Sequence, residues 1–276
     1  MYIVKGNYIF FHIPKTGGKS IYQYFLRRNM LEFAGEHVQY TDFFNNRREI
    51  EIMFKNHEIF LIDSMIVKDV DPRTLSDAIA RARIEKEEQW QYFLKISENP
   101  NKNLKNYNLL TTIRNPIDWY ISFYHHGYSM PNKPNSFSNI CKLLSFEEFI
   151  AEFVEKANIG LYTKTVCNFI LPIRINTRAM VKDKEKSYIY NNFDELCPVT
   201  FLKIENIKEE MLKYVPEICS GSENDEFLHI NKGGEQKNQE SREKYLDFFE
   251  KSRELLLKKY DTIRDKDKLI FEKAGY

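Results

Sequence analysis

The chain has 276 residues, of which 42% are apolar and 29% are charged, so it can build a sizeable core as a soluble globular protein. Its 41 basic and 40 acidic side chains leave a formal net charge of +1. This balance argues against a nucleic acid or a membrane surface as a partner, because no overall field attracts either, but it permits a local basic site for an anion.

The sequence also gives no sign of membrane insertion, export or metal binding. No apolar run approaches the ~20 residues that cross a bilayer, and Lys5 and His12 interrupt the N-terminal apolar stretch, unlike in a signal peptide. The absence of any C-x-x-C pair predicts buried free thiols rather than a zinc site or a disulfide framework. The four cysteines are Cys141, Cys167, Cys197 and Cys219. We therefore expect a cytoplasmic protein with no membrane span and no bound metal.

The first predicted unit is a strand, a glycine turn and a helix. Residues 8–13 (YIFFHI) are an apolar run of strand length, which Pro14 and the Gly17–Gly18 pair then end. Residues 19–28 follow with helical character.

Further strands and helices alternate along the rest of the chain. Two more buried strands are predicted at 59–62 and 107–113, and another at 199–204. Helices are predicted at about 75–97, 116–125, 146–156, 162–171 and 239–260.

This alternation predicts an α/β fold in three layers, P-loop-like, with a central, mainly parallel sheet flanked by helices. We expect one domain over residues 1–276. Within it, about 75–98 is a candidate helical insertion, and the loop composition of about 127–139 indicates a mobile loop.

The most informative segment is His12–Ser20 (HIPKTGGKS), which is predicted to leave a strand and enter a helix. Such a turn exposes backbone N–H groups, and the helix N-terminus adds a partial positive charge, so the segment is typical of an anion site. Glycines let the backbone approach a phosphate closely. Lys15 adds a full charge, and Thr16 and Ser20 add hydroxyl donors.

This segment differs from the P-loop of ATP and GTP enzymes, G-x-x-x-x-G-K-[ST]. Residues 18–20 (GKS) match the tail of that motif, but its leading glycine would fall at Ile13, which is followed by Pro14. The lysine placed to reach a transferred group is therefore Lys15, at the start of the turn.

A second candidate anion site follows the predicted strand at 107–113. Arg114 stands at the end of that strand, where ligands gather in open α/β sheets. Ser122 lies eight residues later, about two turns into the next helix at ~3.6 residues per turn. The guanidinium offers forked donors that match phosphate geometry. A later segment, 229–234 (HINKGG), adds a basic residue beside two glycines.

Together these segments resemble the PAPS-dependent sulfotransferase superfamily, and the form HIPKTGG is similar to its carbohydrate-modifying branch. The family's 5′-phosphosulfate loop reads P-K-[TS]-G-[TG]-[TK]-[ST], and an arginine with a serine eight residues later grips the 3′-phosphate. A late basic loop closes over the nucleotide. The resemblance implies 3′-phosphoadenosine 5′-phosphosulfate (PAPS) as sulfuryl donor, PAP as product and no metal. The cofactor-binding residues that it implies are Lys15, Thr16, Gly17, Gly18, Lys19, Ser20, Arg114, Ser122, Lys232, Gly233 and Gly234. Lys15 would also help the bridging oxygen to leave.

Transfer to a hydroxyl also needs a base, and histidine suits this role because its unperturbed pKa is near ~6.5. His57 ranks first, since it lies between the two phosphate motifs, where carbohydrate-modifying relatives often keep their base. His125 or His126 comes next, because both end the predicted helix that carries Ser122. Carboxylates are unranked alternatives, namely Glu36, Glu58 and Asp63.

The acceptor and two competing functions remain open. The HIPKTGG form and 14% aromatic residues favour a small-molecule or glycan acceptor such as a carbohydrate or glycolipid, and the sequence does not indicate an oligomeric state. A P-loop kinase would use the GKS tail and the strand ending at Asp63, but it would need neither Arg114 nor Ser122. A non-catalytic nucleotide-binding protein could keep all the phosphate residues.

Overall fold

A computed structural model gives the structure of the chain. It describes residues 1–34, 39, 91, 95–96, 98, 100–129, 137–171, 175, 177, 180–197, 199–219 and 239–276. A five-stranded sheet in the order β3-β1-β2-β4-β5 forms its centre. The strands are β1 (Tyr2–Val4), β2 (Tyr8–Phe11), β3 (Leu31–Ala34), β4 (Asn108–Ile113) and β5 (Val199–Lys203).

The sheet is parallel on one side and antiparallel on the other. β2 pairs with β4 and β4 with β5 in parallel, whereas β1 runs antiparallel to both β2 and β3. The prediction of a mainly parallel sheet therefore holds for β2, β4 and β5 but not for β1 and β3. The sequence contains a signal for the missed β1–β2 hairpin, because Gly6 and Asn7, a pair typical of tight hairpins, both have positive φ values, of 89° and 64°.

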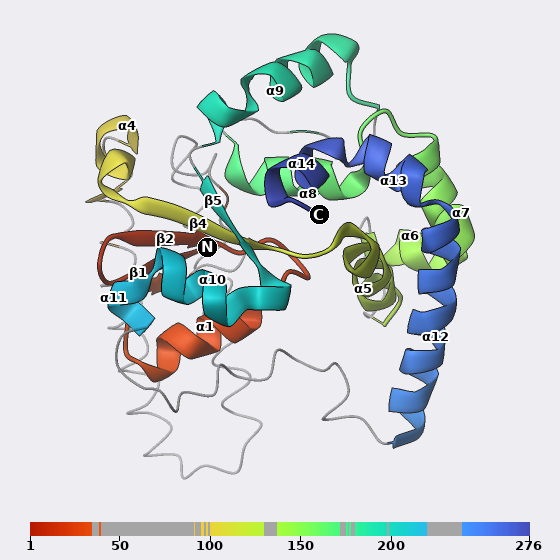
Figure 1. Ribbon diagram of the computed structural model, residues 1–276, viewed down its shortest axis with the longest axis horizontal. Coiled ribbons are helices and arrows are strands. Elements are labelled where there is room, and N and C mark those ends of the chain that lie inside the picture. The colour runs from red at the N-terminus through yellow and green to blue at the C-terminus, as the bar shows by residue number, and fades with distance from the viewer. Residues whose placement is uncertain are drawn as a thin grey trace.

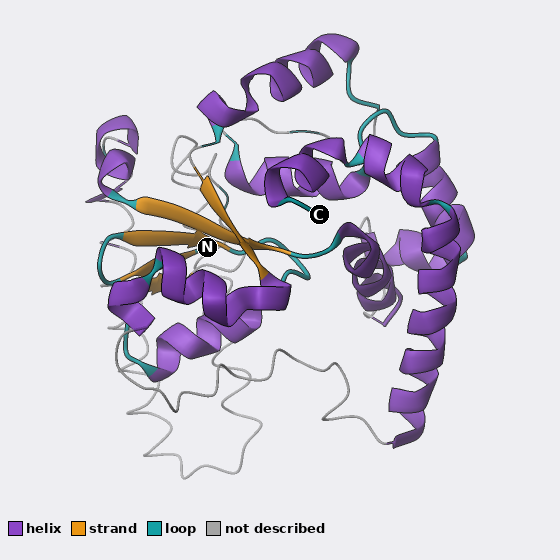
Figure 2. Ribbon diagram, viewed as in Figure 1, coloured by secondary structure: helices purple, strands orange, loops and turns teal. Residues whose placement is uncertain are grey.

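Helices cover both faces of the sheet, as predicted (Figures 1 and 2). The helical segments are α1 (Gly18–Arg27), α4 (Pro100–Asn103), η2 (Leu104–Asn106), α5 (Pro116–Ser129), α6 (Phe137–Leu143), α7 (Phe146–Ile150), η3 (Ala151–Glu155, a π-helix), α8 (Leu161–Ile170), α9 (Asp183–Leu196), η4 (Ile204–Asn206), α10 (Ile207–Tyr214), α11 (Pro216–Cys219), α12 (Gln239–Lys258), α13 (Tyr260–Lys266) and α14 (Lys268–Ala274). Among these, α4, α6, α9, α10, α11, α13 and α14 and the short segments η2 and η4 were not predicted.

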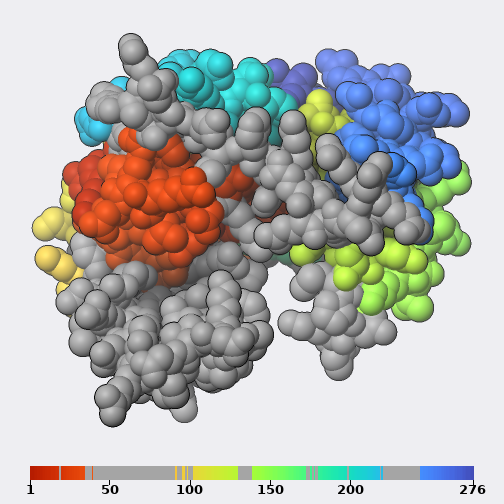
Figure 3. Space-filling view, turned by 90° about the horizontal axis from the view of Figure 1, so that it is seen from below, coloured from red at the N-terminus to blue at the C-terminus, as the bar shows by residue number. Residues whose placement is uncertain are grey.

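Side chains of the central strands alternate between the two helical layers, as the period of a strand requires. Phe10 and Leu110 belong to a core shared with α1, α10 and α11, whereas Ile9 and Leu109 belong to a larger core shared with α5, α8 and α14. Seen from below, the N-terminal residues with α1 lie on one side of the molecule and α12 lies on the other (Figure 3).

Several predicted boundaries need correction. β2 ends at Phe11, so His12 and Ile13 already belong to the turn. α5 continues to Ser129, and α6 begins at Phe137, so both ends of the predicted loop at 127–139 are helical. Tertiary packing explains this, because α5 packs against α6 and α12 and these contacts extend the helices beyond what composition favours.

Other expectations are confirmed or lie outside the described residues. The four cysteines are free and buried, and burial raises the pKa of Cys141 to about 11, as in unreactive structural thiols. The predicted strand at 59–62 and most of the candidate insertion at 75–98 lie outside the described residues. The single-domain expectation stays a prediction.

A buried carboxylate joins the C-terminal helices to the core. Asp267 lies between α13 and α14, where its Oδ2 accepts a hydrogen bond from Tyr120 Oη at 2.7 Å and its Oδ1 accepts one from the Thr163 N–H at 2.8 Å. Gly160 approaches so closely that a Cβ there would lie 2.3 Å from Oδ1. Burial raises the pKa of Asp267 to about 6, while the hydrogen bonds from Tyr120 and Thr163 and the charge of Lys164 lower it.

Asp267 should make the stability of the protein fall as the pH rises from about 4 to 6. In this window the folded chain holds a proton that the unfolded chain, with a carboxyl pKa of ~3.9, has released. A shift of this size changes the free energy of unfolding by on the order of 2–3 kcal/mol. Asp267→Asn should remove this contribution, because an amide does not titrate there.

Urea unfolding of wild type and Asp267→Asn at pH 4, 5, 6 and 7 measures the effect. The other carboxylates act alike in both proteins, so the difference between the two curves isolates Asp267. A difference that stays constant over this range would contradict the prediction.

Candidate functional site

The turn between β2 and α1 has an unusual backbone. Lys15 has a φ of 69°, and Gly17 has a φ of 83°. A left-handed lysine is uncommon, and such costly conformations persist mainly where function requires them. Left-handed residues within a turn direct backbone N–H groups toward a shared concavity that favours anions.

The N-terminus of α1 adds donors to this turn. Gly17 is the N-cap residue and has no side chain to cap the helix, while its carbonyl accepts from the N–H groups of Ser20 and Ile21. The N–H groups of Gly18 and Lys19 have no acceptor within the helix, as is general for a first turn. Uncapped donors at a helix N-terminus are suited to binding a phosphate.

Gly18 is required by the packing of His12 behind the turn. A Cβ on Gly18 would lie 1.9 Å from His12 Cδ2, so no larger residue fits without moving the ring. The ring is itself held by a hydrogen bond of 2.8 Å between its Nδ1 and Tyr2 Oη. The His12 ring therefore packs against the turn at Gly18 and is itself held in place by Tyr2.

The hydroxyl of Thr16 points into the protein. Its Oγ1 donates to the Ile13 carbonyl at 2.8 Å and lies 3.1 Å from Thr112 Oγ1. Thr16 is fully buried and its hydroxyl is used in these two contacts, so the structure does not present it as the hydroxyl donor that the sequence suggested. Ser20 is half-buried in the first turn of α1, and the side chain of Lys19 lies outside the described part.

Arg114 stands at the carboxyl end of β4, directly after Ile113. β2 and β4 are adjacent and parallel, so their carboxyl ends bring the turn at 12–17 and Arg114 to the same edge of the sheet. The Arg114 side chain is half-buried, and it forms no ion pair within the part of the chain that the structure describes. Its forked donors can therefore serve an anionic ligand.

The geometry of two candidate anion sites at adjacent strand ends agrees with a comparison to known families. A family model described as "Sulfotransferase family" matches residues 2–260. The chain belongs to the sulfotransferase family. The resemblance to its carbohydrate-modifying branch fits this assignment. No curated protein and no solved structure gives a significant match.

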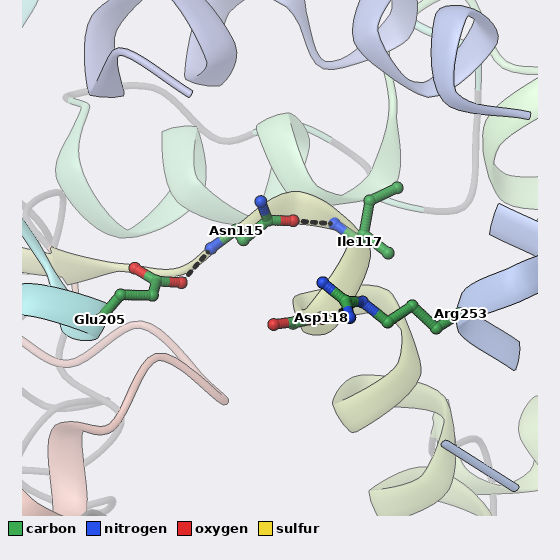
Figure 4. Close-up of polar contacts among 5 residues, drawn as sticks. All are labelled: Asn115, Ile117, Asp118, Glu205 and Arg253. Atoms are coloured by element: carbon green, nitrogen blue, oxygen red, sulfur yellow. Dashed lines mark hydrogen bonds and ion pairs between the residues drawn. The ribbon is translucent and has the colours of Figure 1, made fainter. Parts of the chain in front are cut away.

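In this sulfotransferase Ser122 lies in the second turn of α5, as the spacing from Arg114 predicted. It is half-buried, and its hydroxyl forms no hydrogen bond within the described ranges. Pro116 is the first residue of α5, and the Asn115 side chain accepts from the Ile117 N–H at 2.9 Å, which caps the helix (Figure 4).

Two carboxylates lie near Arg114, and a second arginine lies near one of them. Asp118, on α5, lies 3.8 Å from Arg253 Nε on α12, and Glu205, after β5, accepts from the Asn115 N–H at 2.7 Å (Figure 4). Burial raises the pKa of Asp118, although the charges of Arg114 and Arg253 lower it. No sequence signal selects Arg253 or Glu205, since they are distant from Arg114 in the chain and belong to no motif.

Two of the candidate bases lie on α5, and the others lie outside the described residues. The described contacts of His125 are with α12, where its ring centroid lies 4.5 Å from that of Tyr245 and 5.7 Å from that of Phe248. His126 is exposed on α5. The remaining candidates, together with the late basic loop, lie outside the described residues: Glu36, His57, Glu58, Asp63, Lys232, Gly233 and Gly234.

Two contacts join the two candidate anion sites of the sulfotransferase to each other. The buried Trp119, on α5, donates from Nε1 to the Pro14 carbonyl at 2.9 Å. The hydroxyl of Thr16 forms a hydrogen bond with that of Thr112, on β4. Sequence reasoning missed Trp119, because a buried tryptophan in a helix is most often explained by packing alone.

The described residues also bear on metal binding and on membrane insertion. No group of three or more His, Cys, Asp or Glu side chains in these ranges is arranged to hold a metal ion. Of the helices that the structure describes, none combines the length and apolarity that a membrane span needs.

Proposed function

We propose that this sulfotransferase takes the sulfuryl group from PAPS and transfers it to a hydroxyl group of a carbohydrate or glycolipid. The observation that carries the proposal is the pair of anion-binding features at the carboxyl ends of β2 and β4. The turn at 12–17 suits a 5′-phosphosulfate, and Arg114 with Ser122 suits a 3′-phosphate, the group that distinguishes PAPS from ATP.

The residues present fit such a nucleotide. The uncapped first turn of α1 offers backbone donors for one anion, and Arg114, with no ion pair among the described residues, can bind a second. Arginine and an orienting hydroxyl form a fork suited to a phosphate dianion.

In the proposed reaction, the acceptor oxygen forms a bond to sulfur while the bond from sulfur to the bridging phosphate oxygen breaks. The bridging oxygen gains negative charge, which the Lys15 ammonium would stabilise, and a base takes the acceptor's proton. The backbone N–H groups of the turn would orient the donor. His57 remains the first candidate base.

Thermal unfolding with different nucleotides tests the donor. PAP should raise the Tm more than 5′-AMP, ADP or ATP with magnesium, because only PAP reaches both anion sites. Stabilisation by ATP with no response to PAP would instead indicate a kinase. Tight PAP binding without turnover on a broad acceptor panel would favour a non-catalytic protein.

The acceptor class is tested in the same preparation by supplying PAPS with sugars, phenols and steroids. We expect transfer of the sulfuryl group to sugars, since aromatic side chains can stack on sugar faces. Transfer to phenols alone would contradict it.

A further inference from the structure

One phenol holds the backbone of Arg114 at both of its polar groups. The Arg114 N–H donates to Tyr162 Oη at 2.9 Å, and Tyr162 Oη donates to the Arg114 carbonyl at 3.1 Å. Arg114 follows the last residue of β4 and precedes α5, so neither the sheet ladder nor the helix supplies these bonds. The two hydrogen bonds also use the donor and one acceptor position of the phenol.

Tyr162 is itself held rigidly in the core. Its side chain is fully buried, its ring stacks on Trp119 with centroids 4.3 Å apart and planes 18° apart, and its N–H donates to Tyr120 Oη at 3.2 Å. Tyr120 is tied in turn to the buried Asp267. The Tyr162 hydroxyl is therefore rigidly held, and its two hydrogen bonds fix the position of the Arg114 backbone.

The backbone after Arg114 is held in the same way. The Asn115 N–H donates to Glu205, Pro116 has no N–H, and the Ile117 N–H donates to the Asn115 side chain. Each N–H from 114 to 117 thus has a side-chain acceptor. Because every N–H of this segment is already hydrogen-bonded, the segment loses little conformational entropy when the Arg114 side chain binds a ligand. This is the property of a preorganised site.

We propose that Tyr162 is a positioning residue that gives the enzyme its selectivity for a 3′-phosphorylated nucleotide by fixing the backbone from which the Arg114 side chain extends. This inference rests on the proposed function, and it assigns a role to a side chain that acts through Arg114. Trp119, which stacks on Tyr162 and bonds to Pro14, would position the other turn.

Tyr162→Phe tests the proposal because it keeps the stacked ring and removes both hydrogen bonds to Arg114. Calorimetry should show PAP affinity falling about tenfold, the scale of one charge-assisted hydrogen bond, with 5′-AMP affinity changed by less than about twofold. The ratio of the two dissociation constants is the readout, because a general loss of stability would not alter it.

Two further variants sharpen this test. Tyr124→Phe is the matched control. It too removes a hydrogen bond from a phenol to a backbone carbonyl, since Tyr124 Oη on α5 donates to the Leu144 carbonyl at 2.8 Å. It should leave the ratio of dissociation constants unchanged. In an Arg114→Ala background, Tyr162→Phe should have no further effect on the ratio, because both changes act through one guanidinium.

A wild-type protein that does not bind PAP would overturn the proposed function itself. If wild type binds PAP and Tyr162→Phe keeps the wild-type ratio, the role of Tyr162 alone is overturned. Should Tyr162→Phe not fold, hydrogen exchange of the wild-type protein decides. The Arg114 amide should be protected before any nucleotide is added, and exchange as fast as in an open loop would overturn the proposal.

Discussion

Replacing Lys15 with alanine should lower kcat about 10²- to 10³-fold, the range seen when one donor to a developing negative charge is removed. The charge on the bridging oxygen grows only as the bond to sulfur breaks, so the ammonium contributes more in the transition state than in the ground state. The affinity for PAP should fall less, about tenfold, since the backbone N–H groups of the turn still contact the 5′-phosphate. Steady-state kinetics with PAPS and calorimetry with PAP measure the two effects.

Lys258→Ala is the matched control for this variant, because Lys258 is an exposed lysine near the end of α12 and belongs to neither turn. It should keep the kcat of wild type. Equal losses in kcat and in PAP affinity after Lys15→Ala would assign Lys15 to ground-state binding and contradict its role in the leaving of the bridging oxygen.

Arg114→Ala should weaken PAP binding about 100-fold, because a bidentate contact supplies two charge-assisted hydrogen bonds of about 1.5 kcal/mol each. The affinity for 5′-AMP should hardly change, since that nucleotide has no 3′-phosphate. The PAP affinity of Arg114→Lys should lie between those of wild type and Arg114→Ala, because lysine restores the charge without the planar fork. Calorimetry with PAP and 5′-AMP on each variant measures the difference.

Arg264→Ala provides the control, as Arg264 is exposed on α13 and belongs to neither anion site. Circular dichroism should show that Arg114→Ala folds, because the Arg114 backbone contacts to Tyr162 do not involve its side chain. PAP binding as tight as in wild type would refute the assignment of Arg114 to the 3′-phosphate.

The sequence predicted the central part of the fold because local patterns encode it. The apolar run at 8–13 and the Pro-Lys-Thr-Gly-Gly turn mark β2 and its loop, and Arg114-Asn115-Pro116 marks the end of β4 and the start of α5. The antiparallel strands β1 and β3 were missed, since they are only three and four residues long and the tight turn between β1 and β2 was not used as a hairpin signal.

The parts of the site that were not predicted depend on tertiary contacts. Tyr162, Glu205 and Arg253 reach the neighbourhood of Arg114 from three separate elements, and no spacing within the chain connects them. Their roles become visible only once the hydrogen bonds and ion pairs are known. The positions of the predicted base at His57 and of the late basic loop remain predictions.

The pairing of β2 with β4 also sets the order in which the protein can assemble. Thr111 Oγ1 donates to the Phe11 carbonyl at 2.8 Å across 100 residues of chain, and the two candidate anion sites depend on this same pairing. Contacts between residues so distant in sequence form slowly, because a long loop must close before they are gained. During synthesis, therefore, the N-terminal turn must wait for β4 and α5 before Thr16 contacts Thr112 and Pro14 contacts Trp119, so the proposed donor site is among the late structures of folding.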